Sequence, residues 1–134
     1  MIVLDASSWV LALVDSSPVG AAARDLLAAD RDWMAPAHAP IEVLRTIRRY
    51  EATTVLSPEA ATALAHAVVQ AEIRLVTPDP SLLAYVWDQR HNVSPYDAPY
   101  LGLAHRYAVP LVTNDVRLAR AAETLGVEVV VPSG

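Results

Sequence analysis

Two aspartates in the second half of the chain stand where they can do chemistry. One predicted helix begins at Asp97 and another at Asp115, and each aspartate lies on the apolar side of its helix. The apolar residues at spacings of three, four and seven are Tyr100, Leu101 and Ala104, and Leu118, Ala119 and Ala122. A carboxylate that faces a core is costly unless it is hydrogen-bonded, paired or bound to a cation. The two helices flank one short strand, so the sequence predicts an acidic site there.

A third aspartate, Asp5, directly follows the apolar run at residues 2–4, which is typical of a buried strand. In an open parallel sheet, groups that follow the carboxyl ends of strands converge on one crevice. Converging carboxylates repel one another unless cations lie between them, and oxygen ligands favour hard ions. Asp5, Asp97 and Asp115 therefore indicate a site for Mg²⁺ or Mn²⁺, ions that support in-line displacement at a phosphodiester.

Each aspartate also has a purely structural alternative. Asp5 could cap the first helix, and either Asn114 or Asp115 could cap the last one. Asp97 could close a capping box with the serine three residues before it. In that register the proline two residues after Asp97 would lose a helical hydrogen bond, so a later helix start is favoured. A later start leaves the carboxylate of Asp97 free.

Glu42 lies in a predicted helix that runs from Pro40 to about Tyr50, on the face opposite its apolar residues. Arg45 and Arg49 share the face of Glu42. A solvated Glu–Arg pair, worth tenths of a kcal/mol, is the structural alternative to a place in the acidic site. The two arginines could guide RNA phosphates towards Glu42, or they could be solvated charges.

The composition excludes several kinds of chemistry. The 134 residues include no cysteine, which excludes disulfides, thiolate metal sites and a cysteine nucleophile. All ten basic residues are arginine, so there is no P-loop lysine and no Schiff base. The net charge is −5, and removing four carboxylates that belong to a metal cluster leaves −1. Overall acidity therefore does not argue against a nucleic-acid substrate.

The amino-terminal segment is apolar but lacks a basic leader and is interrupted by Asp5. It is typical of a core strand and helix rather than of a signal peptide. No run approaches the roughly 20 apolar residues that a membrane span needs. A cytoplasmic location without membrane association is therefore expected.

Strands alternate with helices along the whole chain, which predicts one α/β domain over residues 1–134. The predicted strands are 2–4, 33–35, 73–76, 111–113 and 127–131. The predicted helices are 7–14, 19–29, 40–50, 58–70, 80–91 and the two that flank strand 111–113. Right-handed crossovers would give a mostly parallel sheet covered on both faces, a three-layer sandwich.

Four segments together resemble the PIN-domain ribonucleases, and more narrowly the VapC-type toxins of toxin–antitoxin pairs. They are IVLDASS, the helix with Glu42, YDAPYLGLA and LVTNDVRL. The resemblance implies a five-stranded sheet of order 3-2-1-4-5. It also implies a Mg²⁺- or Mn²⁺-dependent endoribonuclease that acts on structured RNA such as transfer or ribosomal RNA. A homodimer, inhibited by a small cognate antitoxin that covers the site, is implied as well.

The resemblance assigns the metal-binding acidic quartet to Asp5, Glu42, Asp97 and Asp115. It matches Ser7 and Thr113 with hydroxyls that sit beside the quartet. Many relatives carry another acid shortly after the last aspartate, whereas Val116 and Arg117 follow here. This departure leaves a second metal position open. It also keeps open a rival function, a binding module with weak catalysis. A nuclease of RNA maturation outside any toxin pair is the other alternative.

Several aromatic and apolar residues are candidates for contacts with RNA or with an antitoxin. Trp9 and Tyr96 could stack on bases, although core packing is expected for both. The apolar content of 54% predicts that some apolar side chains lie at the surface. The candidates are Trp9, Val10, Leu13, Leu26 and Leu27. An antitoxin helix could pack on them while an antitoxin arginine reaches towards the aspartates.

Overall fold

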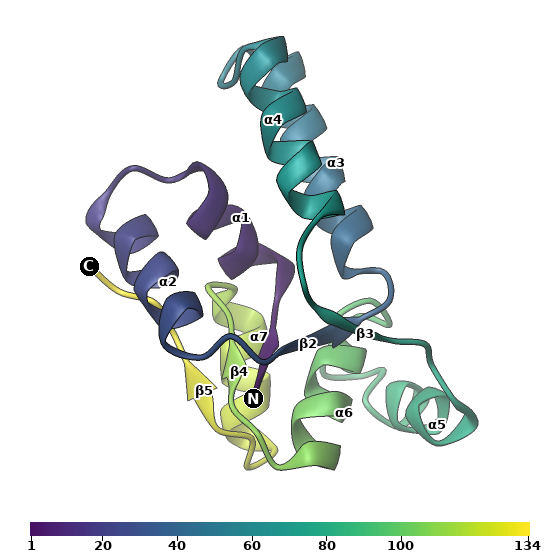
Figure 1. The fold of residues 1–134 in the computed structure, drawn as a ribbon. Helices are drawn as coiled ribbons and strands as arrows, with labels where there is room; N and C mark the ends of the chain where they lie inside the picture. The colour runs from purple at the N-terminus through teal and green to yellow at the C-terminus, as the bar shows by residue number, and fades with distance from the viewer.

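Five short parallel strands form the central sheet of the computed structural model, which describes all 134 residues (Figure 1). The strands are β1 (Ile2–Leu4), β2 (Trp33–Pro36), β3 (Arg74–Val76), β4 (Leu111–Val112) and β5 (Val129–Val130). Their order is β3-β2-β1-β4-β5, which confirms the order that the resemblance implies. Each strand after the first is reached through helices, as parallel pairing requires.

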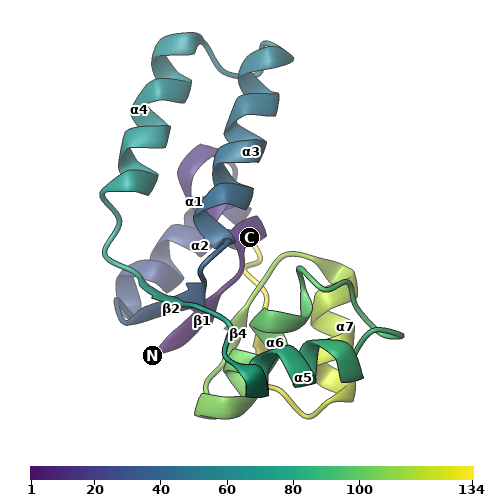
Figure 2. The same ribbon diagram turned by 90° about the vertical axis from the view of Figure 1, so that its right-hand side faces the viewer.

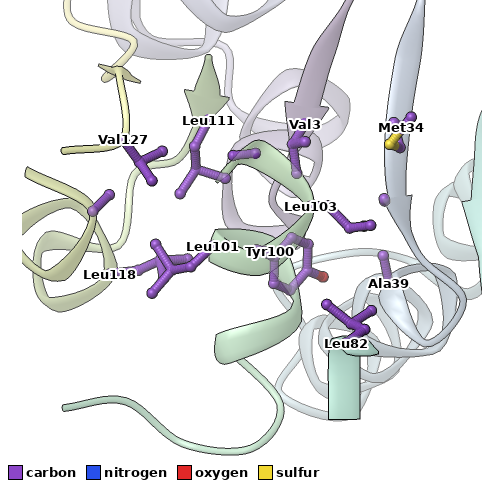
Figure 3. Close-up of a cluster of buried hydrophobic side chains, with 13 residues drawn as sticks. Val3, Met34, Ala39, Leu82, Tyr100, Leu101, Leu103, Leu111, Leu118 and Val127 are labelled. Atoms are coloured by element: carbon purple, nitrogen blue, oxygen red, sulfur yellow. The ribbon is translucent and has the colours of Figure 1, made fainter. Parts of the chain in front are cut away.

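Seven helices cover the two faces of the sheet. They are α1 (Ala6–Val14), α2 (Pro18–Ala29), α3 (Ala39–Ala52), α4 (Pro58–Val69), α5 (Pro80–Asp88), α6 (Ala98–Tyr107) and α7 (Val116–Thr124). Helices α1 to α4 pack on one face and α5 to α7 on the other. The strands divide accordingly, because successive side chains point to opposite faces: Val3 joins the α5–α7 core (Figure 3), and Leu4 joins the other. The predicted three-layer sandwich is confirmed.

Helices α3 and α4 form a hairpin that extends away from the sheet (Figures 1 and 2). Val43 and Ile47 of α3 pack with Ala61 and Val68 of α4 in the core on that face. The first turn of α3 lies at the carboxyl end of β2, close to the rest of the molecule. Residues on this turn, Glu42 among them, can therefore reach the sheet edge while the remainder of α3 lies beyond it.

Side-chain caps set the starts of α4 and α5. The Ser57 hydroxyl accepts a hydrogen bond from the Ala60 amide at the start of α4. Asp79 caps α5 through the Leu82 amide and also accepts two hydrogen bonds from Arg106 of α6, at 2.8 and 2.9 Å. Helix α5 ends at Asp88, three residues before the predicted end, because residues 89–93 close a turn with their own hydrogen bonds.

The predicted apolar surface on the first two helices is wrong for Trp9, Val10 and Leu27 and holds in part for Leu13 and Leu26. Trp9, Val10 and Leu27 are buried in the core between the helices and the sheet, and Leu13 and Leu26 are half-buried. Helix α1 follows β1 after a single residue, so its first turns lie flat on the sheet and bury the side chains there. No helix in the structure has the length and apolarity that crossing a membrane would take.

Candidate active site

The site lies at the carboxyl-terminal end of the sheet, where the neighbouring strands β1 and β4 both end. These two strands are neighbours, and Leu4 pairs in register with Val112. Asp5 and Thr113, the next residue in each strand direction, therefore emerge side by side. The backbone joins them as well, because the Asp5 amide donates to the Val112 carbonyl. A short apolar strand followed at once by a polar residue is the sequence feature that produces this arrangement.

All four predicted acids line one cavity of about 370 Å³ at this edge. Helices α1 and α3 form its walls, with Ser7 on the first and Arg45 and Arg49 on the second. Thr113 is fully buried behind Asp5. The residues singled out from the sequence therefore come together, although their catalytic and metal-binding roles stay predictions.

Asp5 is 5% exposed, and its Oδ2 atom accepts hydrogen bonds from Ser7 Oγ at 2.5 Å and Thr113 Oγ1 at 2.8 Å. Both hydroxyl oxygens in turn accept backbone amides, from Asn114 and Asp115. Asp5 occupies the capping position of α1 but makes no capping hydrogen bond, so the capping alternative is wrong. Oδ1 accepts no hydrogen bond, and no side-chain oxygen is both buried and unpartnered, so Oδ1 keeps contact with the cavity.

The electrostatics of the cavity are those of carboxylates held together. Burial raises the pKa of Asp5 to about 6 against the lowering effect of its two hydroxyl partners, and the charges of Glu42 and Asp97 add to the rise. Burial also raises the pKa of Asp97, followed by repulsion from Asp115 and Glu42. The charges of the neighbouring acids therefore disfavour ionisation of Asp5 and Asp97, and a cation between them would remove that penalty.

Asp115 and Asp97 both precede a helix, but only Asp115 caps its helix with its side chain. Asp115 caps α7, because Oδ1 accepts the amides of Arg117 at 2.9 Å and Leu118 at 3.1 Å. The capping alternative is therefore confirmed for Asp115, and its Oδ2 is left without a hydrogen bond. Helix α6 begins at Ala98, as the later start predicted, and the Asp97 side chain makes no capping bond. The carboxylate of Asp97 is free to act in the cavity.

Glu42 does not form the ion pair with an arginine that its alternative required. Its Oε1 atom accepts a hydrogen bond from the Tyr100 hydroxyl at 2.8 Å and lies 3.2 Å from His38 Nε2. Arg45 and Arg49 are exposed and form no salt bridge. Sequence reasoning missed His38 and the Tyr100 hydroxyl, because Tyr100 was placed on the apolar side of its helix for its ring alone.

Three further side chains, Trp9, Tyr96 and Asn114, bear on the sequence predictions. Trp9 is buried, so its expected place in the core is confirmed. Tyr96 is 69% exposed, so the expected core packing is wrong for it. Its ring stands at the surface one residue before Asp97, because residues 94–97 form the turn that leads into α6. Asn114, also missed, joins the loop after β4 to Ser8 and Pro132 through its amide group.

The donor set has the chemistry of a Mg²⁺ or Mn²⁺ site, because the acids offer only carboxylate oxygens. As the side chains stand, no group of three or more histidine and acidic residues is arranged so as to hold a metal ion. The acids share a cavity without forming a finished cluster. Cation binding therefore requires their side chains to approach one another.

Comparison with known proteins adds the family. A family model of the PIN domain matches residues 2–124. Ribonuclease VapC1 of Mycobacterium tuberculosis is 36% identical over 119 residues, which cover 89% of this chain and 89% of that protein. Ribonuclease VapC3 of the same bacterium is 37% identical over 128 residues, with 90% and 86% covered. The chain belongs to the VapC-type ribonucleases of the PIN-domain family.

Solved structures share the fold of this PIN domain. VapC20 of Mycobacterium tuberculosis, described as a Sarcin-Ricin loop cleaving toxin, superposes with a TM-score of 0.70 at 18% identity, over 90% of this chain and 95% of that one. FitAcB of Neisseria gonorrhoeae superposes with a TM-score of 0.73 at 17% identity, over 98% of each chain. At such identities the likeness establishes the fold alone.

Replacing Glu42 with glutamine separates a role in the acidic site from a structural one. The amide keeps an oxygen that can accept the Tyr100 hydroxyl, so the melting temperature should stay close to that of wild type. The lost charge should lower RNA cleavage by about 10²-fold or more, because a neutral amide oxygen would hold the proposed cation less tightly than a carboxylate does. Gel-based cleavage rates and thermal melts measure both. Full activity in Glu42→Gln would reduce the acidic site to three aspartates.

Proposed function

We propose that this PIN domain is a toxin endoribonuclease that hydrolyses phosphodiester bonds in structured RNA of the transfer- or ribosomal-RNA class, with Mg²⁺ or Mn²⁺ as cofactor. The observation that carries the proposal is that four carboxylates line one cavity together with two arginines, Arg45 and Arg49, that form no salt bridge. Carboxylates select hard cations and guanidinium groups select phosphates. The VapC relatives support ribonuclease activity, and VapC20, which shares the fold, is described as cleaving the Sarcin-Ricin loop.

The residues of the cavity would have different roles in the reaction. Asp5, Glu42, Asp97 and Asp115 would hold the ion. When bound, the ion supplies an activated water and offsets charge at the leaving 3′-oxygen. Ser7 and Thr113 fix Asp5 through Oδ2 and so leave Oδ1 for the cavity. The products would carry 5′-phosphate and 3′-hydroxyl ends.

Arg45 and Arg49 would hold RNA phosphates next to the acids. Changing both to glutamine should weaken RNA binding and reduce the slope of log K against log salt by about 1.4, since each single-strand phosphate contact contributes about 0.7. Filter binding of a catalytically inactive Asp97→Asn background at several salt concentrations gives the slope. Arg48→Gln is the matched control, because Arg48 is exposed on the same helix but lies outside the cavity. Equal effects of the control and the double variant would contradict the assignment.

A cognate antitoxin would have a natural seat in a second cavity, of about 470 Å³. It lies between α1, α2 and α4, and most of its lining is apolar, including Leu13, Leu27 and Trp33. An amphipathic helix of the antitoxin would bury its apolar side there. Arg31 lines the same cavity and forms no salt bridge, so it offers a charge for an acidic antitoxin residue. An antitoxin arginine would pair with Asp5, Asp97 and Asp115, and the toxin would act as a homodimer.

The function is tested by brief induction of the protein in cells, followed by sequencing of RNA ends. The expected result is cleavage at a small number of sites in transfer or ribosomal RNA, with 5′-phosphate ends, and none with Asp97→Asn. Co-expression with the neighbouring open reading frame should yield a complex without RNase activity. Identical RNA ends after induction of the wild-type protein and of Asp97→Asn would overturn the nuclease activity. Cleavage with no co-purifying inhibitor would overturn the toxin assignment and leave the nuclease standing.

A further inference from the structure

His38, the residue that precedes α3, contacts both sides of the acidic site. Its Nε2 atom lies 3.2 Å from Oε1 of Glu42 and 2.8 Å from the carbonyl oxygen of Tyr96, the residue before Asp97. Carboxylate and carbonyl oxygens only accept hydrogen bonds, so Nε2 must carry the proton. The imidazole thus links the helix that bears Glu42 to the turn that bears Asp97.

Tyr100 makes a second link from the opposite face of the sheet. It lies in the first turn of α6, is completely buried, and packs among Ala39, Leu82 and Leu103 (Figure 3). Its hydroxyl donates to Oε1 of Glu42 at 2.8 Å. Because close packing holds the ring, the hydroxyl is a donor in a fixed position.

The ring of His38 is held from two sides. It meets the ring of Tyr96 edge to face at 5.8 Å and the ring of Tyr100 at 5.7 Å, a favoured arrangement for aromatic groups. The hydrogen bonds from His38 and Tyr100 are the only ones that join α3 and its capping residue to residues 94–107. Both contacts to Glu42 use Oε1, so Oε2 is the oxygen left for a ligand.

We propose that His38 and Tyr100 are positioning residues that fix the carboxylate of Glu42 relative to that of Asp97. The inference rests on the proposed function, in which these two acids hold the cation. Glu42 comes from a helix that extends away from the sheet, and Asp97 comes from the helix layer on the other face. A long glutamate side chain loses considerable rotamer freedom when it is held in one place. The Tyr100 hydrogen bond and the His38 contact already hold Oε1 in place, so they reduce the loss on cation binding.

Conservative variants separate positioning from packing. Tyr100→Phe removes one hydroxyl and keeps the buried ring. His38→Leu removes the donor, and His38→Gln returns an amide donor near the position of Nε2. Tyr85→Phe and His105→Leu are the matched controls, because neither Tyr85 nor His105 makes a side-chain hydrogen bond to the acidic site; they stack on each other instead. All variants are made in the full chain.

The main measurement is the Mn²⁺ dissociation constant, obtained by electron paramagnetic resonance without RNA. Tyr100→Phe and His38→Leu should each weaken Mn²⁺ binding by about 10- to 100-fold, as is typical when a group that orients a ligand is lost. The kcat for RNA cleavage should fall in parallel while KM stays constant, and His38→Gln should recover most of both values. In a Glu42→Gln background, Tyr100→Phe should cause no further loss of Mn²⁺ affinity.

Three outcomes would count against the positioning role of His38 and Tyr100 or against the proposed function. Mn²⁺ affinities of Tyr100→Phe and His38→Leu equal to those of the controls would overturn the positioning role while the nuclease stands. Loss without recovery in His38→Gln, matched by a fall in melting temperature, would show that the cluster serves stability only and would also overturn it. A wild-type protein that neither binds Mn²⁺ nor cleaves RNA would instead refute the proposed function.

Discussion

Asp97→Asn is expected to lower RNA cleavage by at least about 10²-fold, and the variant should melt at a higher temperature than wild type in EDTA. The loss of activity follows because asparagine removes a negative charge from the proposed cation site. The gain in stability follows because burial and the charges of Asp115 and Glu42 raise the pKa of Asp97, which means that its ionised form is unfavourable in the folded chain. Helix α6 should be unaffected, since the Asp97 side chain makes no capping bond.

Asp25→Asn is a suitable control for this variant, because Asp25 is exposed on α2 and makes no hydrogen bond through its side chain. It should leave both cleavage and melting unchanged. Cleavage rates measured at saturating Mg²⁺, with melts in EDTA and in Mg²⁺, give the comparison. An active Asp97→Asn protein would refute the acidic site as the catalytic centre. An inactive variant that melts lower would show instead that Asp97 supports the fold.

Asp5→Asn should stabilise the protein increasingly as the pH rises in EDTA. The pKa of Asp5 is raised from an ordinary 3.8 to about 6, so the folded state binds a proton more tightly than the unfolded state. Between these pH values the folded wild type holds more protons, and its stability therefore falls as the pH rises. Above pH 6 the loss approaches about 3 kcal/mol. Asparagine does not titrate and can still accept the hydroxyl hydrogen bonds, so it avoids this loss.

Urea unfolding of Asp5→Asn and wild type from pH 4 to pH 8 measures the difference in unfolding free energy. The difference should be small near pH 4, grow through pH 6 and then level off. Comparing the two proteins removes the contribution of Asp15, Asp30 and Asp79, whose lowered pKa values make stability rise with pH instead. A difference that does not vary with pH would mean that Asp5 ionises in the folded chain as easily as in the unfolded one.

Much of the site follows from the sequence because it depends on local patterns. Short apolar strands that end in polar residues place Asp5 and Thr113 at strand ends. Because strands alternate with helices, the strands are parallel, and their carboxyl ends lie at the same end of the sheet. The position of Pro99 correctly indicated that α6 starts later than the capping-box register allows. Each of these features is decided within a few residues, so pattern alone could identify it.

The interactions of Glu42 could not be predicted, because they depend on contacts between distant segments. Its hydrogen-bond partner Tyr100 lies 58 residues away, on a helix of the opposite layer. On α3 alone, Arg45 and Arg49 are the evident partners, and only the packed structure shows that they remain unpaired. The burial of Val10 was missed for a similar reason, since it depends on how closely α1 lies on the sheet.

The two hydroxyls beside Asp5 have a further consequence for how acid and metal act on this protein. Each hydroxyl donates its one proton to Oδ2, so protonation of Oδ2 would force at least one hydroxyl to turn its proton elsewhere. A proton taken up by Asp5 is therefore favoured on Oδ1, the same atom that is left for a cation. Proton and cation are rival ligands of one oxygen. Acidification would release a bound ion, because the proton takes its place on Oδ1, and the two hydroxyl hydrogen bonds would then set the lower pH limit of a cation-dependent activity.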